Sequence, residues 1–168
     1  SIVIPTRDTC ALTLACLRSV TADPRGQRAE LILVDDGGTD DTVARVREQF
    51  PQVRIVSLPS PAGFTKAANA GLCVATGDVL LLLNSDTETQ PGALDALCDA
   101  FMQDSRLGIA GAQLVYPSGR PQWSAAQSLP GPLWLFAQAS GLALAVSRLP
   151  GYRRLKPLTS GDRRVAWV

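Results

Sequence analysis

Five consecutive apolar residues followed at once by three polar ones place the strongest constraint on this fold. The run is 79–83, and it ends in Asn84, Ser85 and Asp86. A run this short and this apolar is typical of a strand buried on both faces, as in a parallel sheet. The polar triplet would then lie at the C-terminal end of the strand, where open α/β sheets bind their ligands.

The triplet has two interpretations. Asp86 and the amide of Asn84 offer oxygen ligands to Mg²⁺ or Mn²⁺, which favour one or two carboxylates together with substrate phosphates. Alternatively, the three residues form an ordinary turn, because Asn, Ser and Asp are all frequent in turns. The rest of the sequence has to decide between a metal-diphosphate site and a simple strand end.

Composition bounds the class of protein. The 168 residues are 46% hydrophobic and 18% charged, which suits one globular domain with a real core. The formal net charge is +1, yet six of the sixteen basic residues lie from Arg148 onward and fourteen of the fifteen acidic ones precede it. A basic tail can bind anionic lipid or phosphate, and a solvated connector is the alternative.

The cysteines and the lack of histidine narrow the chemistry. There is no His and no CxxC pair among the four cysteines, which disfavours zinc sites and His-based catalysis. Cys16, Cys73 and Cys98 lie among Ala and Leu, so we expect buried free thiols in a reducing compartment. No run approaches the roughly 20 apolar residues of a spanning helix. We therefore expect a cytoplasmic location, with the inner face of the membrane as an alternative.

Strand and helix patterns alternate along the first half of the sequence. We predict strands at 1–4, 31–34, 53–58 and 79–83, and helices after Asp8 or Thr9, after Thr39 or Asp40, and at 64–75. This βαβαβαβ order predicts a parallel, doubly wound α/β sheet. A further helix is expected after Pro91, and a fifth strand at 107–116.

Polar groups follow three of these strands. They are Thr6 with Arg7, Asp35 with Asp36, and the triplet that ends at Asp86. Right-handed crossovers place the C-terminal ends of parallel strands on the same edge of a sheet. Turn formation would explain each cluster singly, but it does not require three polar clusters on one edge. The pattern therefore favours a ligand site.

Five segments, in this order and spacing, resemble the family 2 glycosyltransferases, especially the bacterial rhamnosyltransferase-like branch. They are SIVIPT (1–6), VDDGGTD (34–40), GFTKAANAG (63–71), ATGD (75–78) and LLNSDT (82–87). Each is weak alone, whereas the ordered set is specific. The resemblance implies the GT-A fold, a Rossmann-like, mostly parallel sheet flanked by helices, with the C-terminal acceptor half missing. It implies a nucleotide-sugar-binding core at 1–123 and a helical, basic connector at 124–168.

The resemblance also implies roles for individual residues. Its nucleotide-sugar-binding positions are Pro5, Thr6, Arg7, Asp35, Asp36, Lys66, Asn69, Asn84 and Ser85. Asp35 or Asp36 would accept a hydrogen bond from N3 of uracil or thymine. The triplet occupies the DXD position, where Asp86 would bind Mg²⁺ or Mn²⁺ on the diphosphate. Asn84 replaces the first Asp of that motif, so metal binding would rest mainly on Asp86. Gly38 replaces the more usual Ser, which we expect to matter little.

The implied reaction moves a sugar, with inversion, from a UDP- or dTDP-sugar to a hydroxyl of a saccharide or lipid-linked acceptor, in cell-surface polysaccharide or glycan synthesis. A cation would neutralise charge on the leaving diphosphate, and a general base would deprotonate the acceptor. In this family the base lies in the acceptor half, so we expect it beyond Val168. We expect a fragment of a longer protein that binds nucleotide with little or no turnover.

Several alternatives remain. A non-catalytic nucleotide-binding remnant would fit a truncated chain. A phospho-receiver module would carry its paired acids after the first strand, whereas Asp35 and Asp36 follow the second. A dehalogenase-type phosphatase needs Asp at Asn84, and a dinucleotide oxidoreductase needs a Gly-rich fingerprint after the first strand. The acidic edge opposes nucleic-acid binding. The apolar stretch 133–146 is either a helix that covers the core or an interfacial helix in peripheral contact with a membrane.

Overall fold

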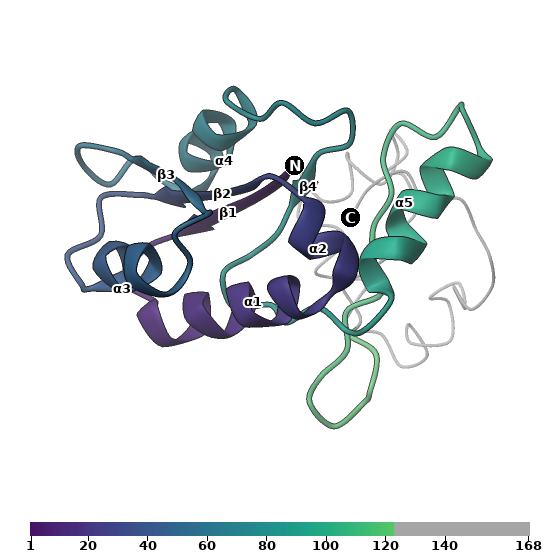
Figure 1. The fold of residues 1–168 in the computed structure, drawn as a ribbon, viewed down its shortest axis with the longest axis horizontal. Helices are drawn as coiled ribbons and strands as arrows, with labels where there is room; N and C mark the ends of the chain where they lie inside the picture. The colour runs from purple at the N-terminus through teal and green to yellow at the C-terminus, as the bar shows by residue number, and fades with distance from the viewer. Residues whose placement is uncertain (123–168) are drawn as a thin grey trace, which may run out of the picture. The chain divides into compact units, whose positions relative to one another are not determined.

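The computed structural model describes residues 1–122, which contain one four-stranded parallel sheet (Figure 1). Its strands are β1 (Ile2–Thr6), β2 (Leu31–Asp35), β3 (Arg54–Ser57) and β4 (Leu81–Leu82). They lie in the order β3-β2-β1-β4, and each neighbouring pair is parallel. The helices are α1 (Cys10–Ala22), α2 (Pro24–Arg28), α3 (Thr42–Gln49), α4 (Phe64–Leu72) and α5 (Ala93–Gln103). The expected parallel α/β sheet flanked by helices is confirmed.

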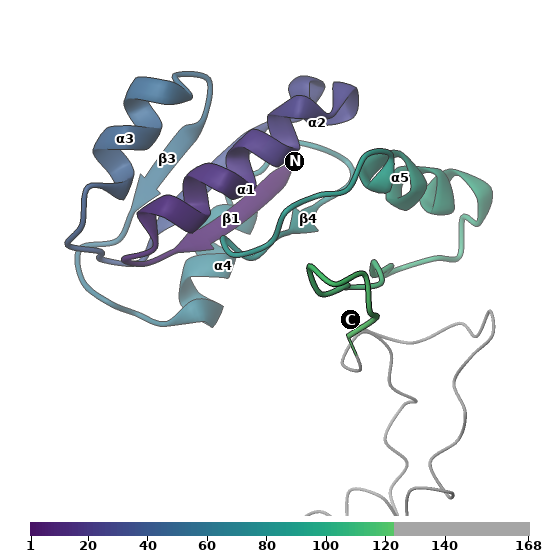
Figure 2. The ribbon, with the colours of Figure 1, turned by 90° about the horizontal axis from the view of Figure 1, so that it is seen from below.

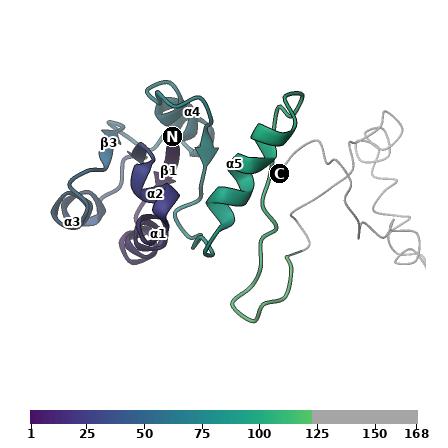
Figure 3. The same ribbon diagram turned by 45° about the vertical axis from the view of Figure 1, so that its right-hand side comes forward.

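Helices cover both faces of the sheet, with α1 and α3 on one side and α4 on the other (Figures 2 and 3). The strand residues alternate accordingly, since successive side chains of a strand point to opposite faces. Ile2, Ile4 and Leu33 pack in the core beneath α1 and α3. Val3 and Val34 pack in a second core beneath α4. Both faces of β1 and β2 are buried, which explains why these strands are apolar up to their last residues, Thr6 and Asp35.

Small residues let α4 approach the sheet closely, as its sequence predicts. Ala67 and Ala68 are buried on its inner side. At Gly71 an added Cβ would lie 2.3 Å from Cγ1 of Val3 and 2.7 Å from Cγ2 of Val34. No larger residue fits there unless the helix moves away from β1 and β2.

Two expectations about strands are wrong. The run 79–83 is not buried on both faces: β4 spans two residues, and the side chains of Val79, Leu80 and Leu82 are exposed. The reason is that β4 pairs only with β1 and has no second neighbour among the described strands. The expected fifth strand at 107–116 forms no ladder with other residues of 1–122. Its only pairing within that part of the chain is an isolated bridge between Val115 and Pro121.

The chain divides into two compact units, Ser1–Asp99 and Ala100–Val168. The sheet and all the predicted site residues belong to the first. In the described part of the second, a short turn is closed by hydrogen bonds between the backbones of Tyr116 and Arg120 and of Leu114 and Gln122. None of the helices in residues 1–122 has the length and hydrophobicity needed to cross a bilayer. The stretch 133–146 and the basic tail lie outside the described residues.

Candidate functional site

The C-terminal edge of the sheet brings the predicted polar residues together. Thr6 at the end of β1 is in register with Asp35 at the end of β2. The pairing continues one step further, because the Asp36 amide donates to the Thr6 carbonyl at 2.9 Å. On the other side of β1, Ser85 follows β4. Because the order is β2-β1-β4, the acidic pair and the triplet flank the end of β1 from opposite sides.

A cluster of hydroxyl groups joins the end of β1 to the triplet. Thr6 Oγ1 lies 2.8 Å from Thr13 Oγ1 and 2.9 Å from Thr9 Oγ1. Thr9 Oγ1 in turn lies 3.3 Å from Ser85 Oγ. Thr6 and Thr13 are buried. Thr6 is therefore a structural link at the edge of the site, with its hydroxyl engaged inside the protein.

Asp36 fixes the loop that leads into α4. Its carboxylate accepts the amide of Ala62 at 2.7 Å and the amide of Gly63 at 3.0 Å. Gly63 has a φ of 89°, a backbone conformation that residues other than glycine rarely adopt. Asp36 is itself buried, so it orders the β2 end of the site from within.

Asp35 and Gly38 form a tight turn after β2. The Asp35 carboxylate accepts the Gly38 amide at 2.9 Å. A Cβ at position 38 would lie 2.8 Å from Oδ1 of Asp35 and 3.3 Å from Oδ1 of Asp8. A serine there would displace the Asp35 carboxylate.

Asp8 is a site residue whose contacts the sequence did not reveal. Its carboxylate accepts the amides of Thr39 at 2.6 Å and Asp40 at 3.2 Å, and so ties the loop after β1 to the loop after β2. The amide of Thr39 holds the pKa of Asp8 below its usual value. The sequence predicts Asp8 or Thr9 as a helix cap. Thr9 occupies the cap position without a side-chain cap bond, whereas Asp8 adopts a φ of 51°. Asp is one of the few residues that tolerate this region, which is the signal available in the sequence.

The triplet forms an exposed turn. The Asn84 carbonyl accepts the Thr87 amide at 3.1 Å, so Asp86 is the third residue of a four-residue turn. Asn84 and Asp86 are exposed and Ser85 is half-buried. Within residues 1–122, no three Asp, Glu, Cys or His side chains come close enough to hold a metal ion. The donors present, one carboxylate with an amide and a hydroxyl nearby, fit an ion that takes its other ligands from phosphate and water.

The remaining predicted residues lie in or directly after β1 and on α4, and they differ in exposure. Pro5 is buried within β1, and Arg7 is exposed with its guanidinium 3.8 Å from the carboxylate of Asp8. Lys66 and Asn69 are exposed on α4, whose first turn follows the loop held by Asp36. The structure brings Arg7 to the same edge as the acidic pair and leaves its charge open to solvent on one side.

The cysteines correct another expectation. All four are free, and Cys16 is buried as predicted. Cys73, however, is exposed, because it lies on the side of α4 opposite the buried Ala67, Ala68 and Gly71, and Cys98 is only half-buried. Helical periodicity alone would have continued the helix to position 75.

Comparisons with known proteins point to one family. The profile described as "Glycosyl transferase family 2" matches residues 1–157. An N-acetylglucosaminyltransferase of Mesorhizobium japonicum is 30% identical over 127 residues, which are 73% of this chain and 30% of that protein. An N-acetylglucosaminyl-diphospho-decaprenol L-rhamnosyltransferase of Mycobacterium tuberculosis is 30% identical over 142 residues, 72% of this chain and 45% of that protein. An uncharacterized Sinorhizobium fredii protein is 32% identical over 127 residues, 73% of this chain and 14% of its own length. The chain therefore spans less than half the length of these relatives.

Solved structures agree on the fold. A mannosyltransferase from Pyrobaculum calidifontis, in complex with GDP-Man and Mn²⁺, has a TM-score of 0.58 and 22% identity over 70% of this chain and 35% of its own. TarS 1–349 from S. aureus, in complex with UDP, has a TM-score of 0.56 and 18% identity over 71% of this chain and 42% of its own. At such identities the likeness establishes the architecture, which is the N-terminal part of a GT-A fold.

Proposed function

Because the chain belongs to glycosyl transferase family 2, we propose that it binds the donor for an inverting glycosyltransferase. The donor is a UDP- or dTDP-sugar, and the acceptor is a hydroxyl of a saccharide or lipid-linked saccharide. We place the reaction in cell-surface polysaccharide or glycan synthesis. Relatives named as N-acetylglucosaminyl- and rhamnosyltransferases, and a structural neighbour solved with UDP, support the proposal.

One observation carries this proposal. The acidic pair after β2 and the triplet after β4 flank the end of β1 on the same edge of the sheet. Because β1 lies between β2 and β4, these two strands are about 10 Å apart. A nucleoside diphosphate spans a comparable length, with a hydrogen-bonding base at one end and a charged diphosphate at the other. We assign the base to Asp35 or Asp36 and the diphosphate to the turn that contains Asp86.

Metal binding is part of the proposal. Asp86 would hold Mg²⁺ or Mn²⁺ through its carboxylate, with Asn84 and Ser85 as neutral neighbours. Such an ion, when bound, neutralises the charge that develops on the leaving diphosphate. Arg7 and Lys66, both exposed, add positive charge at the border of the donor site. We assign no general base within residues 1–122.

Calorimetric titration of the full chain tests the proposal. We expect UDP or dTDP to bind, and Mn²⁺ to strengthen the binding. Asp86→Ala should abolish the gain from Mn²⁺, while Asp78→Ala removes the same charge just before β4, at the opposite edge, and should keep it. No binding of either nucleotide, with or without Mn²⁺, would contradict the proposal.

A pair of variants decides which acid accepts the base. Asp35→Asn and Asp36→Asn each replace a carboxylate oxygen with an amide group of similar size. The variant at the base-binding position should weaken UDP binding about tenfold or more, the scale of a hydrogen bond to a charged group. If neither variant changes the affinity, the base does not bind at the end of β2.

A further inference from the structure

Helix α1 carries polar side chains along one side. Thr9, which precedes its first residue, is followed at helical spacing by Thr13, Cys16 and Ser19. Steps of three and four residues place these groups on neighbouring turns of the same side. The apolar residues of α1, such as Leu14 and Leu17, belong to the main core. Helix α1 therefore has a second, polar contact surface beside its apolar one, and Thr13 and Cys16 on it are themselves buried.

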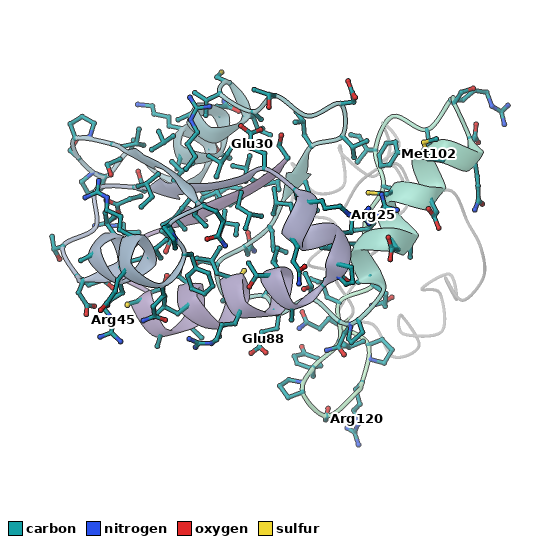
Figure 4. The ribbon with its side chains drawn as sticks, in the orientation of Figure 1. Arg25, Glu30, Arg45, Glu88, Met102 and Arg120 are labelled. Atoms are coloured by element: carbon teal, nitrogen blue, oxygen red, sulfur yellow. The ribbon has the colours of Figure 1, made fainter. Side chains whose placement is uncertain are left out.

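This polar side holds the segment 84–89, which contains the Asp86 turn. Thr9 Oγ1 lies 3.3 Å from Ser85 Oγ, and the thiol of Cys16 donates to the Asn84 carbonyl at 3.7 Å. Ser19 Oγ accepts the amide of Thr89 at 2.9 Å and its hydroxyl at 3.3 Å. Glu88, in the same segment, lies beside α1 in Figure 4.

The chain on either side of this segment is held separately, and after it the Gly92 amide donates to the Asp23 carboxylate at 3.3 Å. The two ends of the segment are held by burial, at Leu83 after β4 and at Leu94 in α5. The last backbone bond to the sheet is from the Leu83 amide to the Val3 carbonyl, at 2.9 Å. Between these ends, α1 supplies the contacts on both sides of the exposed Asp86. The position of that carboxylate therefore depends on the polar side of α1.

We propose that α1, chiefly through Ser19, positions the Asp86 turn to receive the metal-bound diphosphate. This inference rests on the proposed function and assigns Ser19 as a positioning residue that acts through Thr89. A site with a single carboxylate gains most from such support, because its ion has few protein ligands to hold it and the carboxylate must already point the right way. Thr9 and Cys16 fix the near end of the same turn.

The test compares Ser19→Ala with Thr21→Ala in the full chain. Both hydroxyls bond to carbonyls of their own helix, Ser19 to Cys16 and Thr21 to Leu17, each at 2.8 Å. Only Ser19 also contacts the segment 84–89, so Thr21→Ala is a matched control. UDP is titrated with and without Mn²⁺, and thermal unfolding is followed for each variant.

We expect Ser19→Ala to reduce the Mn²⁺-dependent gain in UDP affinity about three- to tenfold, the range that one lost hydrogen bond gives. Metal-free UDP binding should stay unchanged. Thr21→Ala and the conservative Ser19→Thr should both keep the full gain. If Ser19→Ala does not fold, Thr89→Val removes one of the same hydrogen bonds and should show a smaller loss of the same kind.

Two results would overturn the inference while leaving the proposed function intact. One is a full Mn²⁺-dependent gain in Ser19→Ala. The other is an equal loss of affinity with and without Mn²⁺, since that would mean a general disturbance of the site. If the parent chain itself shows no gain from Mn²⁺, both this inference and the metal role of Asp86 fail.

Discussion

Several carboxylates at the edge of the sheet bind backbone amides of the protein itself. Asp8 ties together two loops, and Asp36 holds the amides of Ala62 and Gly63. A hydrogen bond to a charged acceptor is stronger than one to a neutral acceptor, so these carboxylates stabilise the loop geometry. Asp36 could be predicted as a site residue, because two acids follow a strand. Its partners could not, because they lie 26 and 27 residues further along the chain.

Glu30 lies at the opposite edge of the sheet, directly before β2, and makes the free energy of unfolding depend on pH (Figure 4). Its carboxylate accepts the hydroxyl of Ser1 at 2.6 Å and the amide of Thr76 at 2.8 Å. These hydrogen bonds lower the pKa of Glu30 from 4.5 to about 2, and the one from Ser1 has the largest effect. A carboxyl group whose pKa is lower in the folded state stabilises the protein fully at pH values above its unfolded pKa. This stabilisation is lost as the pH falls towards the folded pKa.

We therefore expect the free energy of unfolding to fall between about pH 4.5 and pH 2, and to fall less steeply in Glu30→Gln. Glu48→Gln, at an exposed position of α3, is the control substitution. Urea unfolding at a series of pH values measures this. Parallel curves for Glu30→Gln and the parent would contradict the role of Glu30.

The thiols should differ sharply in reactivity. Cys73 is exposed, whereas Cys16 is buried, and burial raises the pKa of the Cys16 thiol to about 12. At pH 8 the reactive thiolate of Cys16 would amount to about one part in 10⁴. Labelling with a maleimide, located by peptide mass mapping, should modify Cys73 quickly and Cys16 only after unfolding. Modification of native Cys16 as fast as Cys73 would contradict the packing of α1.

At the scale of elements, strands with local signals were predictable and those that depend on distant partners were not. β1 and β2 are apolar up to their last residues because both of their faces are buried. The apolar content of 79–83 suggested the same, but β4 pairs on one side only among the described strands. Likewise 107–116 has strand-like composition and no ladder within residues 1–122. Composition indicates whether a segment suits a strand, whereas pairing depends on what lies beside it.

Helix α1 shows that contacts with residues distant in the sequence could not be predicted for helices either. Its apolar stripe was readable, whereas its polar side appeared neutral because Thr, Cys and Ser are unremarkable in a helix. The spacing of Thr9, Cys16 and Ser19 was the available signal. Their partners in 84–89 lie about 70 residues or more away, beyond any local pattern.

The packing of α4 on the sheet gives a direct prediction. Gly71→Ala places a methyl group within 2.3 Å of Val3 and 2.7 Å of Val34. Overpacking costs up to about 3 kcal/mol, and replacing Gly in a helix regains about 1 kcal/mol. We expect a net loss of about 2 kcal/mol in the free energy of unfolding, measured by urea denaturation. Thr65→Ala, exposed on the same helix, should change it by less than about 0.5 kcal/mol. A Gly71→Ala protein as stable as the parent would mean that α4 sits further from the sheet.

At the scale of the whole molecule, the order of elements determined most of what could be foreseen. Alternating strands and helices implied a parallel sheet, and a parallel sheet brings its strand ends to one edge. That inference required no side-chain detail, and it located the candidate site. The side-chain roles at this edge depend on contacts between loops, which the order of elements does not determine.

The central claim is that one nucleotide lies across the end of β1, between the acidic pair and the Asp86 turn. A crystal structure of the chain with UDP and Mn²⁺ tests it most directly. We expect the uracil N3 within hydrogen-bond distance of the carboxylate of Asp35 or Asp36, and the diphosphate bridged to Asp86 by the ion. UDP bound at another edge of the sheet, or a diphosphate remote from Asp86, would contradict the account.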